Sequence, residues 1–255
     1  MNKKVFVAIT SPISIVLLKG QLQFFSELGY SVSLLCPYSK ESIQFANSEN
    51  VRLIPIDFKR EVSFFNDLIC LFKLIFLMLK ESPDIVNAGT PKASLLTLLA
   101  AKLVGTKKRV YTCRGLRFES ETGVKRKLLM LMEKLTAFSS HHIICISNSV
   151  RNKSIELKIF PVTKTVVIGH GSSNGIDLEY FSKDNPLIPN ISINTQSFVF
   201  GFIGRFVERK GINELVEAFV ELNDKDTTLL MVGGFDTSQQ PSKNTVSQIH
   251  SNKNI

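Results

Sequence analysis

The stretch GFIGRFVERKGINELVEAF, residues 201–219, has the pattern of a strand end, a basic turn and the beginning of a helix. Gly204 and Gly211 flank the turn, and an amphipathic segment follows it. Ligands of open α/β sheets bind at the carboxyl ends of the strands. The stretch therefore predicts an α/β fold in which Arg205 lies at a ligand-binding strand end and Lys210 lies at the start of the next helix.

Arg205 and Lys210 bring positive charge to the place where the first backbone amides of a helix have no partner within that helix. An arginine makes paired hydrogen bonds to phosphate oxygens, and a lysine offers a compact charge that stabilises a departing anion. These two side chains predict a diphosphate site. Arg209 is expected to face solvent or to pair with Glu208. A basic turn without any ligand is the alternative interpretation of the whole stretch.

Upstream of this motif, short β-rich runs alternate with helix-length stretches. The runs are VFVAIT (5–10), SVSLLC (31–36), VRLIPI (51–56), DIVNA (84–88), KRVYTC (108–113), HIICIS (142–147) and TVVIG (165–169). Strands that alternate with helices indicate βαβ units and a parallel, doubly wound sheet. The predicted fold class is therefore α/β, with one complete Rossmann-like domain over residues 1–172.

A polar stretch with two prolines, residues 173–196, is predicted to connect this domain to a second one. The second series has strands at 197–204 and 228–234, a helix near 210–223 and a polar tail, QQPSKNTVSQIHSNKNI. Two strands and one helix are too few for a complete α/β domain. Residues 197–255 are therefore predicted to form an incomplete second Rossmann-like domain, whose unpaired sheet edge lowers solubility.

The composition is that of a globular protein with a sizeable core, since 44% of the 255 residues are hydrophobic and 21% are charged. The four cysteines lie far apart in mostly apolar runs, and the four histidines form no metal-ligand spacing with them. The apolar run behind the N-terminal lysines is too short for a signal peptide. We therefore expect a cytoplasmic protein with reduced, buried cysteines and no metal.

The net charge of +9 is unevenly distributed along the chain. Residues 1–172 hold 24 Lys and Arg against 12 Asp and Glu, a net +12, whereas residues 173–255 hold 7 against 10, a net −3. The basic part is expected to face a membrane surface, a lipid phosphate or a nucleic acid, and a solvated basic surface is the alternative. The chain has no recognisable nucleic-acid module and no Gly-x-Gly-x-x-Gly after its first strand, which disfavours nucleic-acid binding and a nicotinamide dehydrogenase.

Residues 62–80, VSFFNDLICLFKLIFLMLK, predict a strongly apolar helix whose uninterrupted apolar run is too short to span a membrane. On a helical projection the polar residues fall on one stripe: Ser63, Asn66, Asp67, Lys73 and Lys80. The wide apolar arc fits either a helix buried against a sheet or one that rests at a bilayer interface. Residues 125–135, KRKLLMLMEKL, leave the same two alternatives open.

Five stretches, taken in order, resemble the family 4 glycosyltransferases of the two-Rossmann GT-B architecture, especially those that build bacterial capsule, O-antigen or other surface glycans. They are TSPISIVLLKGQLQFFSELGYSVSLLC, PDIVNAGTPKASLLTLLAAKLVGTKKRVYTCRGLRFES, HIICISNSV, GHGSSNGIDLEYF and GFIGRFVERKGINELVEAF. The resemblance covers nearly the whole chain. Its most specific parts are Asn-Gly-Ile-Asp followed by Phe and then Gly-Arg-x4-Lys-Gly.

The resemblance implies transfer of a sugar from a nucleotide donor, most often a UDP-sugar, with retained anomeric configuration and no essential metal or other cofactor. It assigns donor binding to Gly204, Arg205, Lys210 and Gly233, and a catalytic role to Arg205 and Lys210. The implied acceptor is a glycan or a polyprenyl-phosphate-linked glycan. The implied location is the inner face of the plasma membrane, where a basic first domain meets anionic lipid.

The family's first domain generally binds the acceptor, and the acceptor-side candidates here are Ser11, Ser14, Thr90, Lys92, Arg117 and Glu119. For Lys92, a solvated lysine on a plain loop is an equal alternative. The loop of residues 10–14 lacks the glycines common in the family, so a close approach of phosphate to its backbone is less assured.

Arg114 follows the fifth strand, where many family members have a histidine that contacts the donor sugar. We assign it a catalytic role, because a guanidinium binds phosphate or polarises a departing group although it cannot act as a base. An ion pair with Glu119 or Glu121 is the alternative.

Family members continue beyond the residues present here, with a two-glutamate motif that grips the ribose and the donor sugar. We therefore expect a C-terminally truncated chain with very weak donor binding and little turnover of its own. The non-catalytic alternative is a remnant or an accessory subunit that uses only its acceptor-binding domain.

Overall fold

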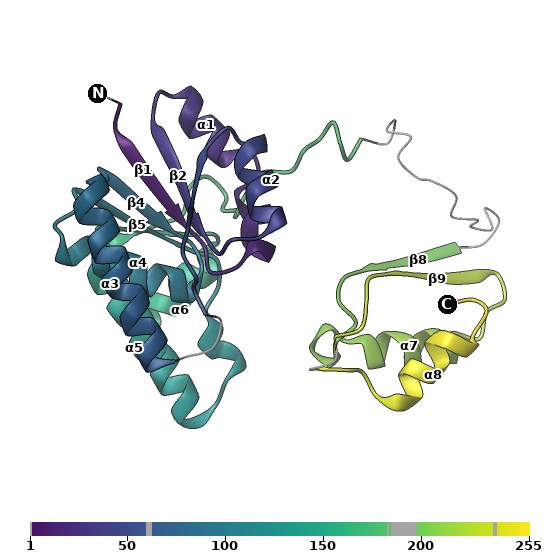
Figure 1. The fold of residues 1–255 in the computed structure, drawn as a ribbon. Helices are drawn as coiled ribbons and strands as arrows, with labels where there is room; N and C mark the ends of the chain where they lie inside the picture. The colour runs from purple at the N-terminus through teal and green to yellow at the C-terminus, as the bar shows by residue number, and fades with distance from the viewer. Residues whose placement is uncertain (1, 60–62, 183, 185–197, 237–238) are drawn as a thin grey trace. The chain divides into compact units, whose positions relative to one another are not determined.

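The computed structural model describes residues 2–59, 63–182, 184, 198–236 and 239–255. Contacts within the chain group it into two compact units, residues 1–178 and 179–255 (Figure 1). Within the predicted connection 173–196, residues 183 and 185–196 lie outside the described residues. The beginning of that connection contacts the first unit, because Ser173 accepts a hydrogen bond from Arg114 and Asn174 donates one to the carbonyl of Lys19.

The first unit is built on a seven-stranded sheet in the order β3-β2-β1-β4-β5-β6-β7, and every pair in it is parallel. The strands are β1 (Lys4–Ala8), β2 (Ser31–Cys36), β3 (Arg52–Pro55), β4 (Ile85–Ala88), β5 (Lys108–Cys113), β6 (His142–Cys145) and β7 (Thr165–Val166). The predicted parallel sheet is thus confirmed. The last strand is shorter than predicted, since only two residues of 165–169 pair with β6.

Helices cover both faces of this sheet (Figure 1). They are α1 (Gln21–Glu27), α2 (Lys40–Ser48), α3 (Phe64–Glu81), α4 (Pro91–Leu103), α5 (Gly123–Ser139) and α6 (Asn148–Glu156), with short 3-10 turns η1 (Pro12–Leu18), η2 (Arg117–Ser120) and η3 (Val162–Lys164). Side chains of β1 pack against the helices on both faces of the sheet, because successive side chains of a strand point to opposite faces. Val5 and Val7 pack with Leu22 of α1, whereas Phe6 and Ala8 pack with the layer that contains α3, α4 and α5.

The beginning of α1 is held by a buried carboxylate. Glu49, only 5% exposed, accepts hydrogen bonds from the backbone amides of Gly20, Leu22 and Gln23 at 2.6, 3.1 and 3.0 Å. A carboxylate is favoured there because it satisfies amides that lack helical partners and complements the positive end of the helix dipole. In many Rossmann-like domains a ligand phosphate binds at this place. Here the protein's own side chain fills it.

For residues 62–80 and 125–135 the sequence left open burial against a sheet or a position at a bilayer interface, and the structure shows helices that are only partly buried. In the layer α3-α4-α5 the central helix, α4, is enclosed on most sides, while α3 and α5 each bury only the stripe that faces the sheet and α4. On α3 the buried stripe contains Cys70, Leu74 and Met78. The opposite side of α3 exposes Phe64, Phe65, Leu68, Ile69, Phe72, Phe76 and Leu79, because one stripe of a helix is all that a flat sheet can cover. No helix among the described residues is long and apolar enough to cross a membrane.

The second unit contains two parallel strands, β8 (Phe198–Ile203) and β9 (Thr227–Val232), with α7 (Ile212–Leu222) and the short turn η4 (Glu208–Lys210). Helix α8 (Lys243–Ser251) lies in the segment that was predicted to be a polar tail, so that interpretation is wrong. Ser242 caps α8 by accepting a hydrogen bond from the amide of Thr245. Ile249 of α8 packs on the core of this unit, and one apolar residue per turn was too weak a pattern to indicate a helix.

All four cysteines are free and buried, as the sequence predicted. Burial raises the pKa of Cys36 and of Cys113 to about 12, because a thiolate loses its hydration in the apolar core. These thiols are therefore inert packing groups rather than nucleophiles.

We predict that Glu49→Ala lowers the free energy of unfolding by about 2 kcal/mol, because three amides at the start of α1 lose a charged acceptor in a buried place. Urea unfolding followed by circular dichroism measures this change. Glu27→Ala, an exposed position on the same helix, is the control and is expected to change stability by less than about 0.5 kcal/mol. Equal effects of the two substitutions would contradict the capping role of Glu49.

Candidate functional site

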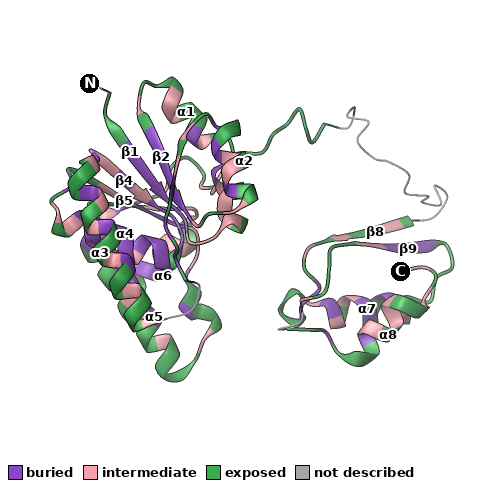
Figure 2. Ribbon diagram, viewed as in Figure 1, coloured by how far each residue is buried: buried purple, intermediate pink, exposed green. Residues whose placement is uncertain are grey.

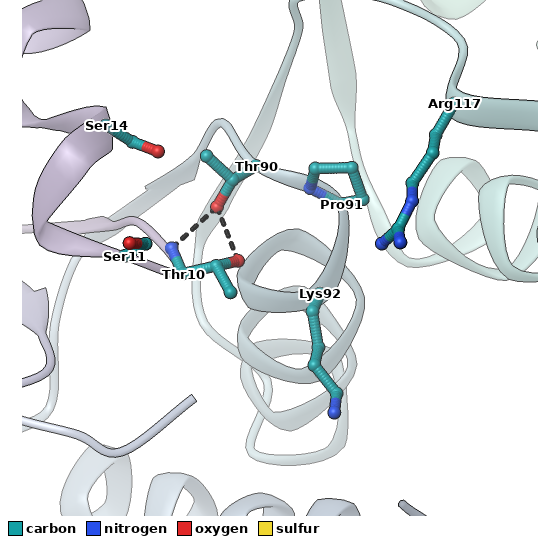
Figure 3. Close-up of a pocket in the computed structure, with 7 residues that line it drawn as sticks. All are labelled: Thr10, Ser11, Ser14, Thr90, Pro91, Lys92 and Arg117. Carbon is teal, nitrogen blue, oxygen red and sulfur yellow. Dashed lines mark hydrogen bonds between the residues drawn. The ribbon is translucent and has the colours of Figure 1, made fainter. Parts of the chain in front are cut away.

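The reversal of strand order places β1 and β4 side by side, with the chain leaving them toward opposite faces of the sheet. Such a switch point opens a crevice at the carboxyl ends of the two strands. A cavity of about 380 Å³ lies there, lined by Thr10, Ser11, Ser14, Thr90, Pro91, Lys92 and Arg117 (Figure 3). Five of the six acceptor-side candidates, all except Glu119, therefore line one cavity.

Two threonines, Thr10 and Thr90, connect the loops that form this cavity by hydrogen bonds. The hydroxyl of Thr90 accepts a hydrogen bond from the amide of Thr10 at 2.7 Å, and the two hydroxyl oxygens lie 2.7 Å apart (Figure 3). The hydroxyl of Thr10 in turn accepts from the amide of Ala93 at the start of α4, at 3.0 Å. The loops after β1 and β4 are thus held together through side chains. Ser11 and Ser14 remain at the cavity wall as half-buried hydroxyls.

Lys92 is buried rather than solvated, which excludes the plain-loop interpretation of this residue. It is 5% exposed, and its Nζ lies 2.7 Å from Oδ1 of Asp67 on α3. In Figure 3 its side chain points away from the two threonines. Asp67, a member of the polar stripe of residues 62–80, thus forms an ion pair between α3 and α4.

Arg114 joins three segments beside the cavity. Its Nε donates to Oγ of Ser173 at 2.6 Å, and its Nη1 donates to the carbonyl of Gly89 at 2.8 Å. A third, longer bond runs to the carbonyl of Leu17 at 3.4 Å. The expected alternative, an ion pair with Glu119 or Glu121, does not form among the described residues, and Glu121 pairs with Lys125. Burial lowers the pKa of Arg114, although a guanidinium stays charged at neutral pH.

A second cavity of about 360 Å³ adjoins the first and shares Thr90, Pro91 and Arg117 with it. Arg114 and Tyr111 line this neighbour. Arg117 is exposed and reaches the shared wall from the segment after β5 (Figure 3). The site thus combines hydroxyl groups with two arginines, a set that suits the hydroxyls of a sugar and the oxygens of a phosphate.

Beneath the second cavity, the hydroxyl of Tyr111 donates to Oε2 of Glu133 on α5 at 2.9 Å. Both residues are buried. Burial raises the pKa of Glu133 to about 7, and the bond from Tyr111 opposes only part of that effect. The floor of the site therefore contains a carboxyl group that changes charge near neutral pH.

In the second unit, Arg205 follows β8 as predicted and lies at the carboxyl end of that strand. Its Nη1 is 2.7 Å from Oδ2 of Asp236, which follows β9, and the arginine side chain is 59% exposed. The pair follows from the parallel register of β8 and β9, which places the two strand ends next to each other. Arg205, a donor-side candidate, is thus oriented by the carboxylate of Asp236.

Gly204 and Gly233 allow these strand ends to approach closely. A Cβ built on Gly233 would collide with the carbonyl oxygen of Gly204, so no other residue fits at position 233 without moving the backbone. The two glycines, both donor-side candidates, are neighbours in the structure. Their part in the fold is to set the spacing of the turn that contains Arg205.

Lys210 is exposed in η4 and directly precedes Gly211, the N-cap of α7. Gly211 has a φ of 71° and contributes no side-chain cap, so the first amides of α7 are not satisfied by this residue. Arg209 is exposed, as one of the two interpretations predicted, and its Nε donates to Gln239 rather than to Glu208. Arg205, Lys210 and the beginning of α7 therefore belong to one turn of the second unit.

Several residues of these sites were not singled out in the sequence. Thr10 and Ser173 belong to segments that were recognised, but hydroxyl groups are too common in loops to be assigned a role there. Asp236 contacts Arg205 through the register of two strands, and that register is not readable from either strand alone. Within the described residues, no group of three or more His, Cys, Asp and Glu is placed to hold a metal ion.

A doubly wound parallel sheet with a cavity at its switch point, followed by a strand-turn-helix unit with exposed cations, defines the class of α/β proteins that bind ligands at the carboxyl ends of their strands. Residues 19–180 match the model of Glycosyltransferase Family 4, and the chain belongs to that family. The resemblance inferred from the sequence is thereby confirmed.

Two relatives and one solved structure place the chain more closely. It is 37% identical over 258 residues to the capsular polysaccharide biosynthesis glycosyltransferase CapM of Staphylococcus aureus, covering 100% of this chain and 67% of CapM. It is 28% identical over 198 residues to the UDP-Gal:alpha-D-GlcNAc-diphosphoundecaprenol alpha-1,3-galactosyltransferase of Escherichia coli, covering 74% of this chain and 49% of that protein. A glycosyltransferase structure from Rickettsia africae matches with a TM-score of 0.71 at 18% identity, covering 100% of this chain and 67% of that one. The predicted GT-B fold class is confirmed.

We predict that the unfolding free energy depends on pH through Glu133. Its folded pKa of about 7 lies above its ordinary value of 4.5, so its contribution to stability is fully present below about pH 4.5 and is lost as the pH rises through 7. The free energy of unfolding of Glu133→Gln, taken relative to that of the wild type, is expected to rise by about 2 to 3 kcal/mol between pH 4.5 and pH 8. Urea unfolding at several pH values measures this gain, with Glu119→Gln as the exposed control. A difference that is constant with pH would contradict the shifted pKa.

Proposed function

We propose that the chain transfers a sugar from a UDP-sugar to a lipid-linked glycan, with retention of anomeric configuration, in the synthesis of a capsule or a related surface polysaccharide. The observation that carries the proposal is the Arg205–Lys210 turn after β8, in a chain that belongs to this family. Support for the biological context comes from CapM, a capsular polysaccharide glycosyltransferase with 37% identity.

The donor diphosphate is proposed to bind in the second unit. Arg205 makes paired hydrogen bonds to phosphate oxygens, and Lys210 adds a compact positive charge. The first backbone amides of α7 contribute further hydrogen bonds. Asp236 holds Arg205 in place before the donor arrives and gives up part of that contact when phosphate binds. UDP is the nucleotide we propose, because the E. coli relative is named for a UDP-sugar donor.

The acceptor is proposed to bind at the β1–β4 switch point. Ser11, Ser14 and Thr90 offer hydroxyls for hydrogen bonds to a sugar, and Arg117 offers a charge for a phosphate at the cavity's edge. The E. coli relative is named for a diphosphoundecaprenol-linked acceptor, which has both of these groups. Arg114 is proposed to position the cavity wall through Gly89 and Ser173, and to place its remaining donors toward the reacting groups.

In the proposed reaction the bond between the anomeric carbon and the diphosphate oxygen breaks. A bond from an acceptor hydroxyl oxygen forms on the same face of that carbon, and the hydroxyl proton leaves with the diphosphate. Negative charge grows on the departing UDP, and Arg205 and Lys210 stabilise it at that moment. We propose that these cations suffice without a metal ion, and that the reaction takes place on the cytoplasmic face of the plasma membrane.

Calorimetric titration with UDP tests the donor site directly. We predict saturable binding that persists in the presence of EDTA and weakens by about ten-fold or more in Arg205→Ala, because a charge-assisted contact with phosphate is lost. Asp236→Asn is expected to bind UDP several-fold more tightly than the wild type, because Arg205 no longer has a competing carboxylate.

Arg209→Ala is the matched control, since it removes another exposed cation from the same turn without touching the predicted phosphate contacts. If Arg205→Ala and Arg209→Ala lowered the affinity for UDP equally, the loss would be explained by net charge alone. That result would contradict the proposed site. A folded chain that binds no UDP would favour the accessory acceptor-binding function over the transferase.

A further inference from the structure

The outer surface of the α3-α4-α5 layer is apolar along three neighbouring helices. On α3, Phe72 is 62% and Phe76 is 70% exposed, and Phe64 and Phe65 are 77% exposed at its beginning. On α5 the exposed apolar residues are Val124, Leu128, Leu131, Leu135 and Phe138, and on α4 Leu103 is exposed as well. Figure 2 shows exposed residues along much of α3. We call this set of residues the outer apolar face.

These helices lie on the same side of the sheet, because α4 contacts both α3 and α5 and all three contribute to one core. The buried stripes of α3 and α5 face inward, so their opposite stripes share the outside of the layer. Soluble monomeric proteins rarely expose so many large apolar side chains together, and such a surface marks an interaction site.

The charges around the outer apolar face distinguish between two possible occupants, an anionic lipid surface and a second copy of the chain. The three helices contain three acidic residues, and each is engaged inside the protein or in an ion pair: Asp67 with Lys92, Glu81 with Lys4 and Arg52, and Glu133 with Tyr111. The exposed cations of α3 and α5 include Lys73, Lys80, Lys125, Lys127 and Lys134. The exposed charged residues of these helices are therefore cations, of which Lys125 pairs with Glu121 just before α5. Aromatic and aliphatic side chains bordered by cations are complementary to an anionic lipid surface. A second copy of this face would instead bring like charges together.

A groove beside α3 shows the same combination at close range. It has a volume of about 530 Å³ and lies between α3 and the end of β3, where Phe72 and Phe76 stand next to Lys73 and Lys80. Apolar walls with lysines alongside suit a lipid, whose acyl chain and anionic headgroup need both kinds of contact.

The outer apolar face extends to the edge of the sheet that holds the cavity. Helices α3, α4 and α5 each follow a parallel strand, so each begins at the carboxyl edge of the sheet. Phe64, Phe65 and Val124 stand at these beginnings, and Lys92 of the cavity wall is ion-paired with Asp67 in the first turn of α3. A ligand anchored in a bilayer at this face would therefore present its polar end near the cavity.

We propose that the outer apolar face of α3, α4 and α5 docks on an anionic lipid bilayer, with the aromatic side chains of α3 entering the interface and the lysines contacting lipid phosphates. Docking in this position brings the head of a lipid-linked acceptor to the β1–β4 cavity without removing its lipid from the bilayer. That second statement rests on the proposed function, whereas the docking itself does not.

The chain contains no tryptophan, which makes a single introduced one a specific reporter. We predict that the emission of Phe72→Trp shifts to shorter wavelengths when vesicles of phosphatidylglycerol and phosphatidylethanolamine are added, and that brominated lipids quench it. Phe24→Trp is the matched control, because Phe24 is 54% exposed on α1, which covers the other face of the sheet. Its emission is expected to stay unchanged.

Sedimentation with the same vesicles gives the strength of binding. Phe72→Gln combined with Leu131→Gln is expected to weaken it by on the order of ten-fold, because both side chains are exposed and lose only contacts with lipid. Vesicles of phosphatidylcholine alone are expected to bind about ten-fold less protein than anionic ones. Equal sedimentation of the double variant and the wild type would overturn the proposal.

Two further results would overturn it. One is an unchanged emission of Phe72→Trp with anionic vesicles, and the other is a short-wavelength emission without lipid that grows with protein concentration, which would assign the face to a second copy of the chain. No UDP or sugar is present in these experiments. A failed UDP titration would therefore leave the docking result intact, and a failed docking experiment would leave the donor site intact.

Discussion

The reversal of strand order between β1 and β4 is the constraint on which the first unit depends. It separates α1 and α2 from the layer of α3, α4 and α5, and it opens the crevice that becomes the cavity. Thr10 and Thr90 hold the two loops together at that point, at a distance set by their hydroxyl groups. Arg114 likewise links the segment after β7 to this region through its hydrogen bond to Ser173. The place of the site thus follows from topology, and its shape follows from a few side-chain hydrogen bonds.

Acidic and basic side chains of the first unit differ in where they lie. Three acidic groups of the first unit are used within the protein: Glu49 caps α1, Asp67 neutralises the buried Lys92, and Glu133 accepts from Tyr111. Among the described residues, the cations of this unit other than Lys92 are at least partly exposed, so the net +12 of residues 1–172 acts at the surface. In the second unit the arrangement is different, because Arg205 is exposed and is oriented by Asp236. A basic first unit and a locally cationic strand end are two separate uses of positive charge.

The sequence predicted the strands well because parallel strands buried on both faces are short apolar runs between turns. It also predicted Arg205 at the end of β8, since glycines and a basic turn mark that position. It did not predict the burial of Lys92, which depends on Asp67 from another helix, or the contact of Arg205 with Asp236, which depends on register. Whether the apolar side of α3 is buried or exposed was left open for a related reason. A helical projection gives the width of an apolar arc but not how much of it neighbouring elements cover, and here only the stripe near Leu74 is covered.

Sugar transfer itself is the most direct test of the proposed function. The measurement is mass spectrometry of an undecaprenyl-diphosphate-linked acceptor after incubation with the 255-residue chain and a panel of UDP-sugars. The proposed function predicts that one donor adds a single sugar to the acceptor, at the low rate expected of a chain with weak donor binding, and that Arg205→Ala abolishes most of this product. Wild-type protein that is folded and binds the acceptor, yet adds no sugar from any donor in the panel, would contradict it.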